Sequence, residues 1–297
     1  MSESAQDING SGEDSGKTVE KFSFADGRHY HNEPNCPYPM PNDLDEIDRC
    51  MQLDLQHYAI QQVTQKRYHA PLENPKRALD IGTGSGTWLM EMATDFPECE
   101  FLGVDIAPLQ PTTILPSNCT FELANVLEGL RHSDGSFDYV RRSLLVAAIP
   151  KDQWTSHVEE CARLCAPGGW VEMVESDAGY YGGGPARKKQ GELLLSVLHA
   201  RGLSPETTTM LDELMRDAGL VDIQVKEYRL PSGKGAGRIG ELFLKDSVLI
   251  QAALVPLYMK MYNMAREELD QLIEQGNEES KMLESYGKLY VYVGRKP

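Results

Sequence analysis

The 297-residue sequence lacks several features that mark whole classes of protein. Its six cysteines include no Cys-x-x-Cys pair, and no apolar run approaches the roughly 18 residues that span a bilayer. Segment 1–21 is rich in Ser, Gly, Asp and Glu and lacks the apolar stretch of a secretory signal. We therefore expect no membrane partner and reduced thiols in the cytoplasm, with the nucleus as the alternative location.

Positive charge is also scarce. The chain has 29 Lys and Arg against 45 Asp and Glu, a formal net charge of -16, and no cluster rich in Lys and Arg. A surface that neutralises nucleic-acid phosphates needs such a cluster, so we expect no nucleic-acid partner and favour small molecules or proteins as substrates. Cys161 and Cys165 share one predicted helix face, which is at most half a metal site. We expect them to pack in the core, and we expect no metal.

Strand and helix patterns alternate from Arg77 onward. The alternating segments are 78–81, 87–96, 100–105, 120–123, 137–140, 153–165 and 170–174, followed by helix 206–218 and strand 221–230. Pro167-Gly168-Gly169 indicates a turn before the strand that starts at Trp170. Such alternation predicts βαβ units and an α/β fold with a mostly parallel sheet.

The length suits one globular unit with appendages around this core. We expect a disordered acidic tail over 1–21, an N-terminal extension over 22–76 that contains a helix over 44–67, and a ligand-binding core over 77–231. A helical insert follows over 232–287, with helices predicted over 239–264 and 266–275, and residues 288–297 form the final core strand.

A glycine turn, residues 80–86 with the sequence Asp-Ile-Gly-Thr-Gly-Ser-Gly, joins the first core strand to its helix. Alternating glycines let the backbone turn tightly and let a ligand approach the main chain. A dinucleotide fingerprint requires Gly or Ala where Thr87 stands. Asp80 would repel a pyrophosphate but suits the ammonium and sulfonium groups of S-adenosylmethionine (SAM). The turn therefore predicts SAM.

Further cofactor residues are expected where the next strands end. Asp105 closes the second strand about twenty residues past the turn, where it can accept hydrogen bonds from the ribose hydroxyls. Asn125 and Val126 are placed for the adenine, and segment 141–144 completes the cleft. The full set of predicted cofactor residues is Asp80, Gly82, Thr83, Gly84, Ser85, Gly86, Asp105, Ile106, Asn125, Val126 and Arg142.

Five passages carry a resemblance to a known family. They are Gly27–Tyr30 with Tyr38 and residues 41–43, Leu53–His57, the glycine turn through Trp88, Gly103–Pro111, and Leu164–Asp177. Together they resemble the fungal LaeA-like methyltransferases, which are found with secondary-metabolite biosynthesis and its regulation. The resemblance implies a Rossmann-like class I methyltransferase fold with a mostly parallel seven-stranded sheet, helices on both faces, and SAM as the cofactor.

The residues on the acceptor side are less specific. Methyl transfer from a sulfonium is an in-line displacement of an activated leaving group, so alignment can supply most of the catalysis. For a hydroxyl acceptor, His57, His29 and His31 are candidate general bases, and Tyr180 in loop 177–184 is a candidate for contact with the acceptor. A packing role for each His, and a loop without contacts, are the alternatives. Met259, Met261 and Met264 with Leu254, Leu257 and Tyr258 either line an acceptor pocket or pack in the core.

The predicted function is SAM-dependent methyl transfer to oxygen, nitrogen or sulfur of a small molecule, in secondary-metabolite biosynthesis. One alternative is a regulator of secondary metabolism that keeps the methyltransferase fold and acts through protein partners. Another is a nicotinamide-dependent oxidoreductase, which Thr87 disfavours. The sequence specifies neither the methyl acceptor nor the oligomeric state.

Overall fold

A computed structural model describes residues 22–25, 28–31, 37–39 and 46–297. The acidic tail expected over 1–21 lies outside the described residues. Strands β1 (Phe22–Ala25) and β2 (Arg28–His31) form an antiparallel pair. The N-terminal helix expected over 44–67 is α1, Glu46–Thr64.

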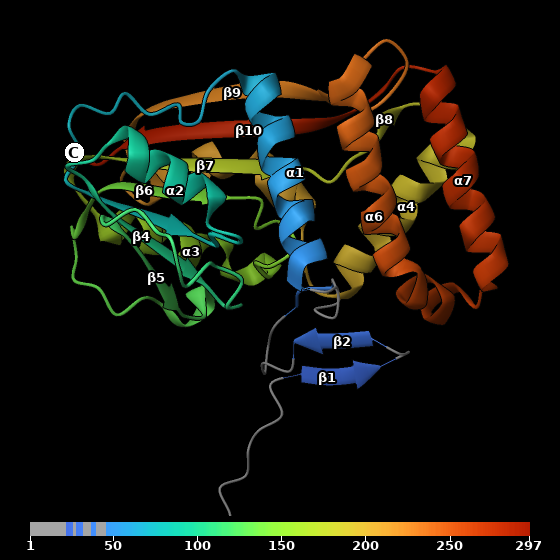
Figure 1. Ribbon diagram of the computed structural model, residues 1–297, viewed down its shortest axis with the longest axis horizontal. Helices are drawn as coiled ribbons and strands as arrows, with labels where there is room; N and C mark the ends of the chain where they lie inside the picture. Colours follow the sequence, from blue (N-terminus) through green and yellow to red (C-terminus); the bar gives the residue numbers. More distant parts are fainter. Residues whose placement is uncertain (1–21, 26–27, 32–36, 40–45) are drawn as a thin grey trace, which may run out of the picture.

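The core is a mixed sheet of eight described strands in the order β5-β4-β3-β6-β7-β10-β8, with β9 paired to β10 (Figure 1). Their bounds are β3 Arg77–Ile81, β4 Glu100–Asp105, β5 Cys119–Leu123, β6 Phe137–Ser143, β7 Cys165–Ser176, β8 Tyr181–Gly182, β9 Val221–Pro231 and β10 Ser285–Arg295. Strands β3 to β7 pair in parallel, and β10 is antiparallel to β7, β8 and β9. The predicted α/β class is confirmed, and the short strand β8 is an addition to the seven strands expected.

The prediction that a turn at Pro167–Gly169 precedes the strand is wrong. Strand β7 already begins at Cys165 and runs through these residues. The pairing with β6 shifts register there, since Phe137 lies opposite Cys165 and Tyr139 lies opposite Trp170. Proline and glycine mark an irregularity inside the strand, because a bulge accommodates residues that a regular ladder excludes.

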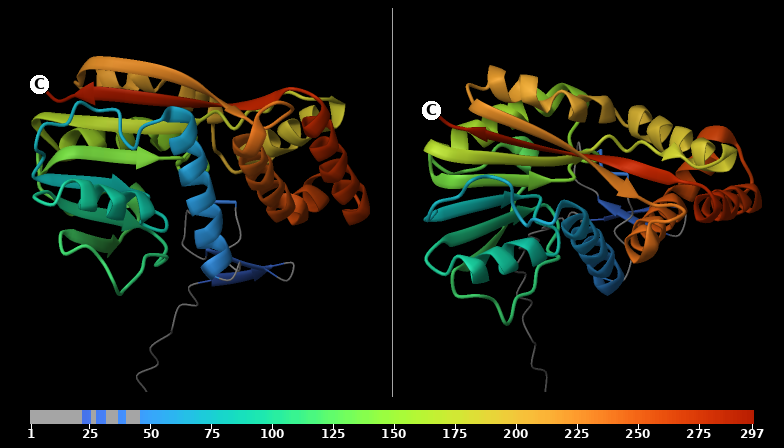
Figure 2. Two further views of the ribbon diagram at one scale, coloured as in Figure 1. Left: turned by 45° about the horizontal axis from the view of Figure 1, so that its top comes forward. Right: turned by 90° about the horizontal axis from the view of Figure 1, so that it is seen from above.

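Helices cover both faces of the sheet, which the right view of Figure 2 shows edge-on. Helix α2 (Thr87–Asp95) packs on one face, and α3 (Trp154–Leu164) and α5 (Leu211–Asp217) pack on the other. Side chains alternate along a strand, so Leu79 and Ile81 join the core under α3 whereas Ala78 joins the core under α2. Each face of the sheet therefore has its own hydrophobic core.

A third core lies beside the sheet, among the helices α4 (Pro185–Ala200), α6 (Gly237–Tyr262) and α7 (Arg266–Met282) (Figure 1). We call these three helices the cap. Helix α1 contacts both α6 of the cap and α2 of the core. Helices α6 and α7 confirm the two helices expected in the insert. Helix α4 was not expected, and the helix expected over 206–218 is instead a 3-10 turn, Pro205–Thr209, followed by α5.

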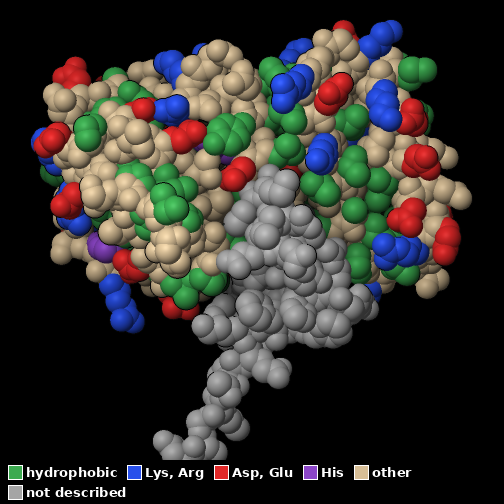
Figure 3. All heavy atoms as spheres, viewed as in Figure 1, with side chains coloured by type: hydrophobic (Ala, Val, Ile, Leu, Met, Phe, Trp, Pro, Cys, Tyr) green, Lys and Arg blue, Asp and Glu red, His purple; other side chains and the backbone are tan. Residues whose placement is uncertain are grey.

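By length and composition alone, α6 is also apolar enough to cross a membrane, because its most apolar 18-residue stretch has a mean hydropathy of 1.4. Its length and hydropathy are weak evidence for a membrane span, since 44% of that stretch is buried inside the protein and buried core helices have the same length and hydropathy. Its exposed apolar residues include Leu249, Met261 and Tyr262. In Figure 3 hydrophobic side chains gather over this part of the surface, while acidic and basic side chains are interspersed over the visible face.

One buried ion pair connects β6 to the end of β7. Arg142 and Glu175 are both fully buried, and the Arg142 guanidinium also lies 4.7 Å from the centre of the Trp154 ring in α3. Glu175 accepts further hydrogen bonds from the backbone N–H groups of Leu145 and Val146, at 2.8 and 3.1 Å. Burial raises the pKa of Glu175, and the charge of Arg142 opposes that rise. The pair therefore fixes the loop that follows β6.

Replacing Arg142 with Met is expected to lower the free energy of unfolding by about 3–5 kcal/mol, because Glu175 would remain as an uncompensated buried charge. Urea denaturation measures this, and adding Glu175→Gln should recover part of the loss. The matched control is Arg295→Met, which breaks an exposed pair with Asp222 and should cost less than about 1 kcal/mol. Similar small costs for both single variants would contradict the role given to the buried pair.

Candidate functional site

A cavity of about 410 Å³ lies at the carboxyl ends of the parallel strands, a volume typical of small-ligand sites. Its core side is formed by the glycine turn and by the segments that follow β4, β5, β6 and β7. Its other side is formed by α1 and by α4 and α6 of the cap. The expected cofactor residues that line it are Asp80, Gly82, Thr83, Gly84, Ser85, Asp105, Ile106, Asn125 and Val126.

The glycine turn is held close to β4. Gly82 and Thr83 donate backbone hydrogen bonds to the Val104 carbonyl, at 2.8 and 3.0 Å. Gly82 has a φ of 71°, and a Cβ there would lie 2.5 Å from the Leu145 side chain, so the position requires glycine. Gly86 does not line the cavity: it has a φ of 79°, and a Cβ there would lie 2.5 Å from the Phe121 ring. Its place at the cofactor stays a prediction, since the space beside it is filled by core packing.

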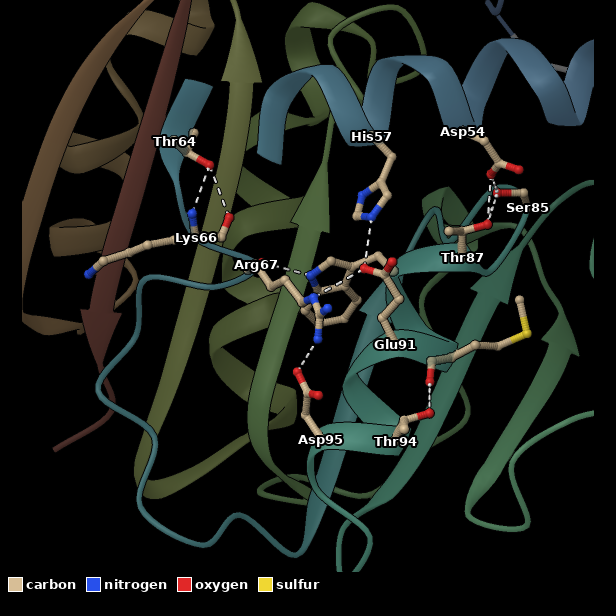
Figure 4. Close-up of polar contacts among 12 residues, drawn as sticks. Asp54, His57, Thr64, Lys66, Arg67, Ser85, Thr87, Glu91, Thr94 and Asp95 are labelled. Atoms are coloured by element: carbon tan, nitrogen blue, oxygen red, sulfur yellow. Dashed lines mark hydrogen bonds and ion pairs between the residues drawn. The ribbon is translucent and has the colours of Figure 1, made fainter. Parts of the chain in front are cut away.

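Helix α1 is joined to this turn by Asp54. One oxygen of the Asp54 carboxylate accepts hydrogen bonds from the hydroxyls of Ser85 and Thr87, each at 2.7 Å. Figure 4 shows Asp54 pointing from α1 toward both hydroxyls. Thr87, read in the sequence as a departure from a dinucleotide fingerprint, thus has a positive role in this fold. It connects the start of α2 to α1.

Asp80 forms an ion pair with an arginine from the neighbouring strand. Strands β3 and β6 place Asp80 opposite Arg141, whose Nη1 donates to Asp80 Oδ1 at 2.9 Å. The Arg141 guanidinium lies 4.0 Å from the centre of the Trp88 ring, and Arg141 lines the cavity. Burial raises the pKa of Asp80, and Arg141 opposes that rise. The predicted Arg142 is wrong as a cofactor residue, because alternation along β6 turns it toward α3 and away from the cavity.

Asp105 and Asn125 are both oriented by backbone N–H groups. Asp105 accepts hydrogen bonds from Gly84 at 2.8 Å and from Ala107 at 2.9 Å, so its carboxylate also supports the glycine turn. The Asn125 side chain accepts from Leu127 at 3.1 Å and caps the 3-10 turn Val126–Glu128. Both residues line the cavity. The Asn125 carboxamide is therefore committed in part to its own loop.

His57 lines the cavity and is oriented by a carboxylate of α2. Its Nε2 lies 3.1 Å from Glu91 Oε2, and Figure 4 shows the ring directed from α1 toward Glu91. Burial lowers the pKa of His57, with Glu91 opposing, and so favours the neutral ring. A neutral, oriented imidazole has the protonation state of a general base. His29 and His31 belong to β2, where the structure describes the backbone only.

Tyr180 belongs to a loop that the structure orders through several contacts. Its hydroxyl accepts hydrogen bonds from Ser247 Oγ at 2.8 Å and from Gln251 Nε2 at 3.2 Å, and the residue lines the cavity. Tyr181 instead donates to Asp177 at 2.6 Å. The alternative of a loop without contacts is wrong. Among the apolar residues proposed for an acceptor pocket, only Leu254 lines the cavity.

The sequence interpretation missed a buried carboxylate on α6. Asp246 is 6% exposed, lines the cavity, and accepts hydrogen bonds from Gln52 at 3.3 Å and Gln56 at 3.1 Å, both on α1. Burial raises the pKa of Asp246 from 3.8 to about 6, while the two amides favour the charged form. The available signal was a lone acidic residue in the largely apolar segment 242–255 of the insert.

Comparison with known proteins identifies the family. Residues 78–169 match a family model described as "Methyltransferase domain". The "Protein-methionine methyltransferase laeA" of Emericella nidulans is 26% identical over 298 residues, covering 93% of this chain and 77% of that protein. The "Methyltransferase pytC" of Aspergillus terreus is 30% identical over 229 residues, covering 73% of this chain and 67% of that protein. The chain belongs to the LaeA-like family of SAM-dependent methyltransferases.

Other relatives agree with this assignment. The "Secondary metabolism regulator laeA" of Coprinopsis cinerea is 36% identical over 163 residues, which cover 52% of this chain but only 39% of that protein. Among solved structures, a protein from Anabaena variabilis, whose name assigns it to the methyltransferases of an antibiotic biosynthesis pathway, is similar in fold. It has a TM-score of 0.53 and 16% identity, and the match covers 80% of this chain and 95% of that one.

SAM is therefore the methyl donor of this LaeA-like protein. The core side of the cavity fits it. Gly82 and Gly84 present bare main chain to it, and the carboxylate of Asp105 suits a donor that carries ammonium and sulfonium charges, whereas the charge of Asp80 is already paired with Arg141. The Asp105 carboxylate lies at the end of β4, and its contact with the ribose hydroxyls stays a prediction.

Replacing Asp105 with Ala is expected to weaken SAM binding by about 10- to 100-fold, because hydrogen bonds to a charged group contribute about 1.5–3 kcal/mol. The variant also removes the acceptor that orients the Gly84 N–H. Calorimetric titration measures the change. Asp95→Ala, at the end of α2 with a 44% exposed side chain, is the control and should bind SAM as the wild type does. Unchanged affinity in a folded Asp105→Ala protein would refute the assignment.

The raised pKa of Asp246 predicts a specific pH dependence of stability. Its folded-state pKa of about 6 exceeds the ordinary 3.8, so the folded state holds the proton more tightly and the wild type loses stability as pH rises from 4 to 6. A pKa difference of about 2 corresponds to about 3 kcal/mol. Asp246→Asn should lack this loss, as urea denaturation at several pH values will show.

Asp270→Asn serves as the matched control, since the Asp270 side chain on α7 is 57% exposed. Its stability should follow the wild type across the same pH range. Parallel curves for the wild type and Asp246→Asn would show that Asp246 does not titrate in this way.

Proposed function

We propose that this LaeA-like methyltransferase methylates an oxygen, nitrogen or sulfur atom of a small molecule of secondary metabolism. The observation that supports this most is the continuity of the cavity. The same cavity is lined by the glycine turn on the core side and by α4 and α6 on the cap side. An acceptor in the cap half would therefore lie next to the methyl donor.

The cap half has the character of a site for a largely apolar molecule. Leu194, Leu198, Phe243, Ile250 and Leu254 line it, together with a few polar side chains on α4 and α6. Such sites combine an apolar lining with a small number of placed polar groups that orient the ligand. The relatives from Aspergillus terreus and Strobilurus tenacellus are likewise named methyltransferases.

The chain's own residues would mainly align the reactants. When bound, SAM supplies a methyl group that its sulfonium already activates, so positioning provides most of the rate. Asp105 and the glycine turn hold the donor side, and Tyr180 with α6 shapes the acceptor side. His57, neutral and oriented by Glu91, is the residue available to accept a proton from a hydroxyl acceptor.

A protein acceptor is the competing possibility, since the Emericella nidulans relative is named a protein-methionine methyltransferase. No methionine of the described residues lines the cavity of this chain. A methionine acceptor would thus have to enter from another molecule or from residues outside the described ranges. The assay must therefore separate methyl transfer to a small molecule from methyl transfer to a protein.

The test uses purified full chain with methyl-labelled SAM and a small-molecule extract of the source organism. We expect label in the small-molecule fraction, resolved by mass spectrometry, and a loss of most of that label with Asp105→Ala, whereas Asp95→Ala should match the wild type. Label found only on protein would reject the small-molecule acceptor. Binding of SAM without any transfer would favour a regulator acting through protein partners.

A further inference from the structure

Arg187, on α4, is a buried cation in the cap half of the cavity. It is 2% exposed and lines the cavity. Its Nη1 donates to Gln190 Oε1 at 3.0 Å and to Ser247 Oγ at 2.7 Å, and its guanidinium carbon lies 3.7 Å from the centre of the Tyr180 ring. All three partners are neutral.

The neighbouring carboxylates are bound elsewhere. Glu279 of α7 accepts a hydrogen bond from the Arg187 backbone N–H at 2.9 Å, at the first turn of α4, where the helix dipole favours a negative charge. Asp246, next to Ser247 on α6, accepts its hydrogen bonds from Gln52 and Gln56. Among the described residues, no carboxylate forms an ion pair with the Arg187 guanidinium, and its buried Nε has no hydrogen-bond acceptor.

A buried charge in this state is costly. Leaving an ion buried without a partner costs several kcal/mol, and a guanidinium remains charged at every accessible pH although burial lowers the pKa of Arg187. The stacking on Tyr180 offsets only part of that cost. The side of the guanidinium formed by Nε and Nη2 is also the edge that pairs with a carboxylate through two parallel hydrogen bonds.

We propose that Arg187 binds a carboxylate carried by the methyl acceptor, so that the preferred acceptors are organic acids. Arg187 then determines substrate class and orientation, and does not take part in the transfer itself. The inference rests on the proposed function, since it assigns a chemical class to that acceptor.

The carboxylate of SAM is the other possible source of this charge, and the position of Arg187 favours the acceptor. Its partners belong to α4, to α6 and to the loop after β7, whereas the donor side is built from β3, β4 and the turn between β3 and α2. Figure 1 shows α4 and α6 on the opposite side of α1 from α2. A negative group bound at Arg187 would therefore lie in the cap.

The test measures binding without methyl transfer. Phenylacetate, the neutral phenylacetamide of similar shape, and the cation 2-phenylethylammonium are titrated calorimetrically into the full chain saturated with S-adenosylhomocysteine. We expect phenylacetate to bind at least about tenfold more tightly than the amide, a difference of about 1.4 kcal/mol, and the cation to bind no better than the amide. Arg187→Met should remove the preference, and Arg187→Lys, which keeps the charge without the planar fork, should keep part of it.

Lys189→Met is the matched control, because Lys189 lies on the same helix with a 51% exposed side chain. It removes one positive charge outside the cavity and should leave the preference for phenylacetate intact. Affinity for S-adenosylhomocysteine should be the same in the wild type and in Arg187→Met. A tenfold loss in that variant would assign the arginine to the carboxylate of SAM and overturn the inference.

Three other outcomes would overturn it: equal binding of phenylacetate and the amide, no binding of phenylacetate up to about 10 mM, or a preference that persists in Arg187→Met. The proposed function is judged separately, by label in the small-molecule fraction. Methylation of small molecules without a preference for acids would reject the role of Arg187 alone. A carboxylate preference with label only on protein would reject the proposed function and leave the anion site.

Discussion

Two hydrogen bonds to Asp54 join α1 to the glycine turn, and much of the site depends on that helix. Because Ser85 and Thr87 donate to the same carboxylate, α1 is fixed at the start of α2. Neighbouring residues of α1 then reach their own partners: Gln56 contacts Asp246 of the cap, and His57 contacts Glu91 of the core. The passage Leu53–His57 thus closes one wall of the cavity and connects its two halves.

The two halves of the site differ in how their charges are neutralised. On the donor side, Asp80 is paired with Arg141 and Asp105 is bound by backbone N–H groups. On the cap side, Asp246 has only neutral amide donors and Arg187 only neutral partners. The cap side therefore retains charge that a ligand can neutralise, whereas the donor side is already close to balance. Stability and recognition compete in the cap, because buried charges that would attract a ligand destabilise the free protein.

Most of the residues that line the core side of the cavity were predictable from sequence, because the signals are local: alternating glycines, an acidic residue at a strand end, and strand patterns of period two. The choice of Arg142 over Arg141 was wrong. It depended on which residues of β6 face the cavity, and this follows from the pairing of β6 with β3, which places Arg141 opposite Asp80. Helix α4 was missed because buried Arg187 and Gln190 interrupt its apolar pattern. Asp246 could not be placed at all, since its partners lie 190 and 194 residues away in the sequence.

The position of β10 has a consequence for biosynthesis. This strand lies between β7 and β9 but follows both of them in the sequence, after the two long helices α6 and α7. At about 5–20 residues per second, a ribosome needs several seconds to make the roughly 50 residues that separate β9 from β10. During that interval the facing edges of β7 and β9 lack their partner, and unpaired edges are the surfaces through which nascent sheets associate wrongly. The half-made sheet is therefore the state in which this chain is most open to wrong strand pairing.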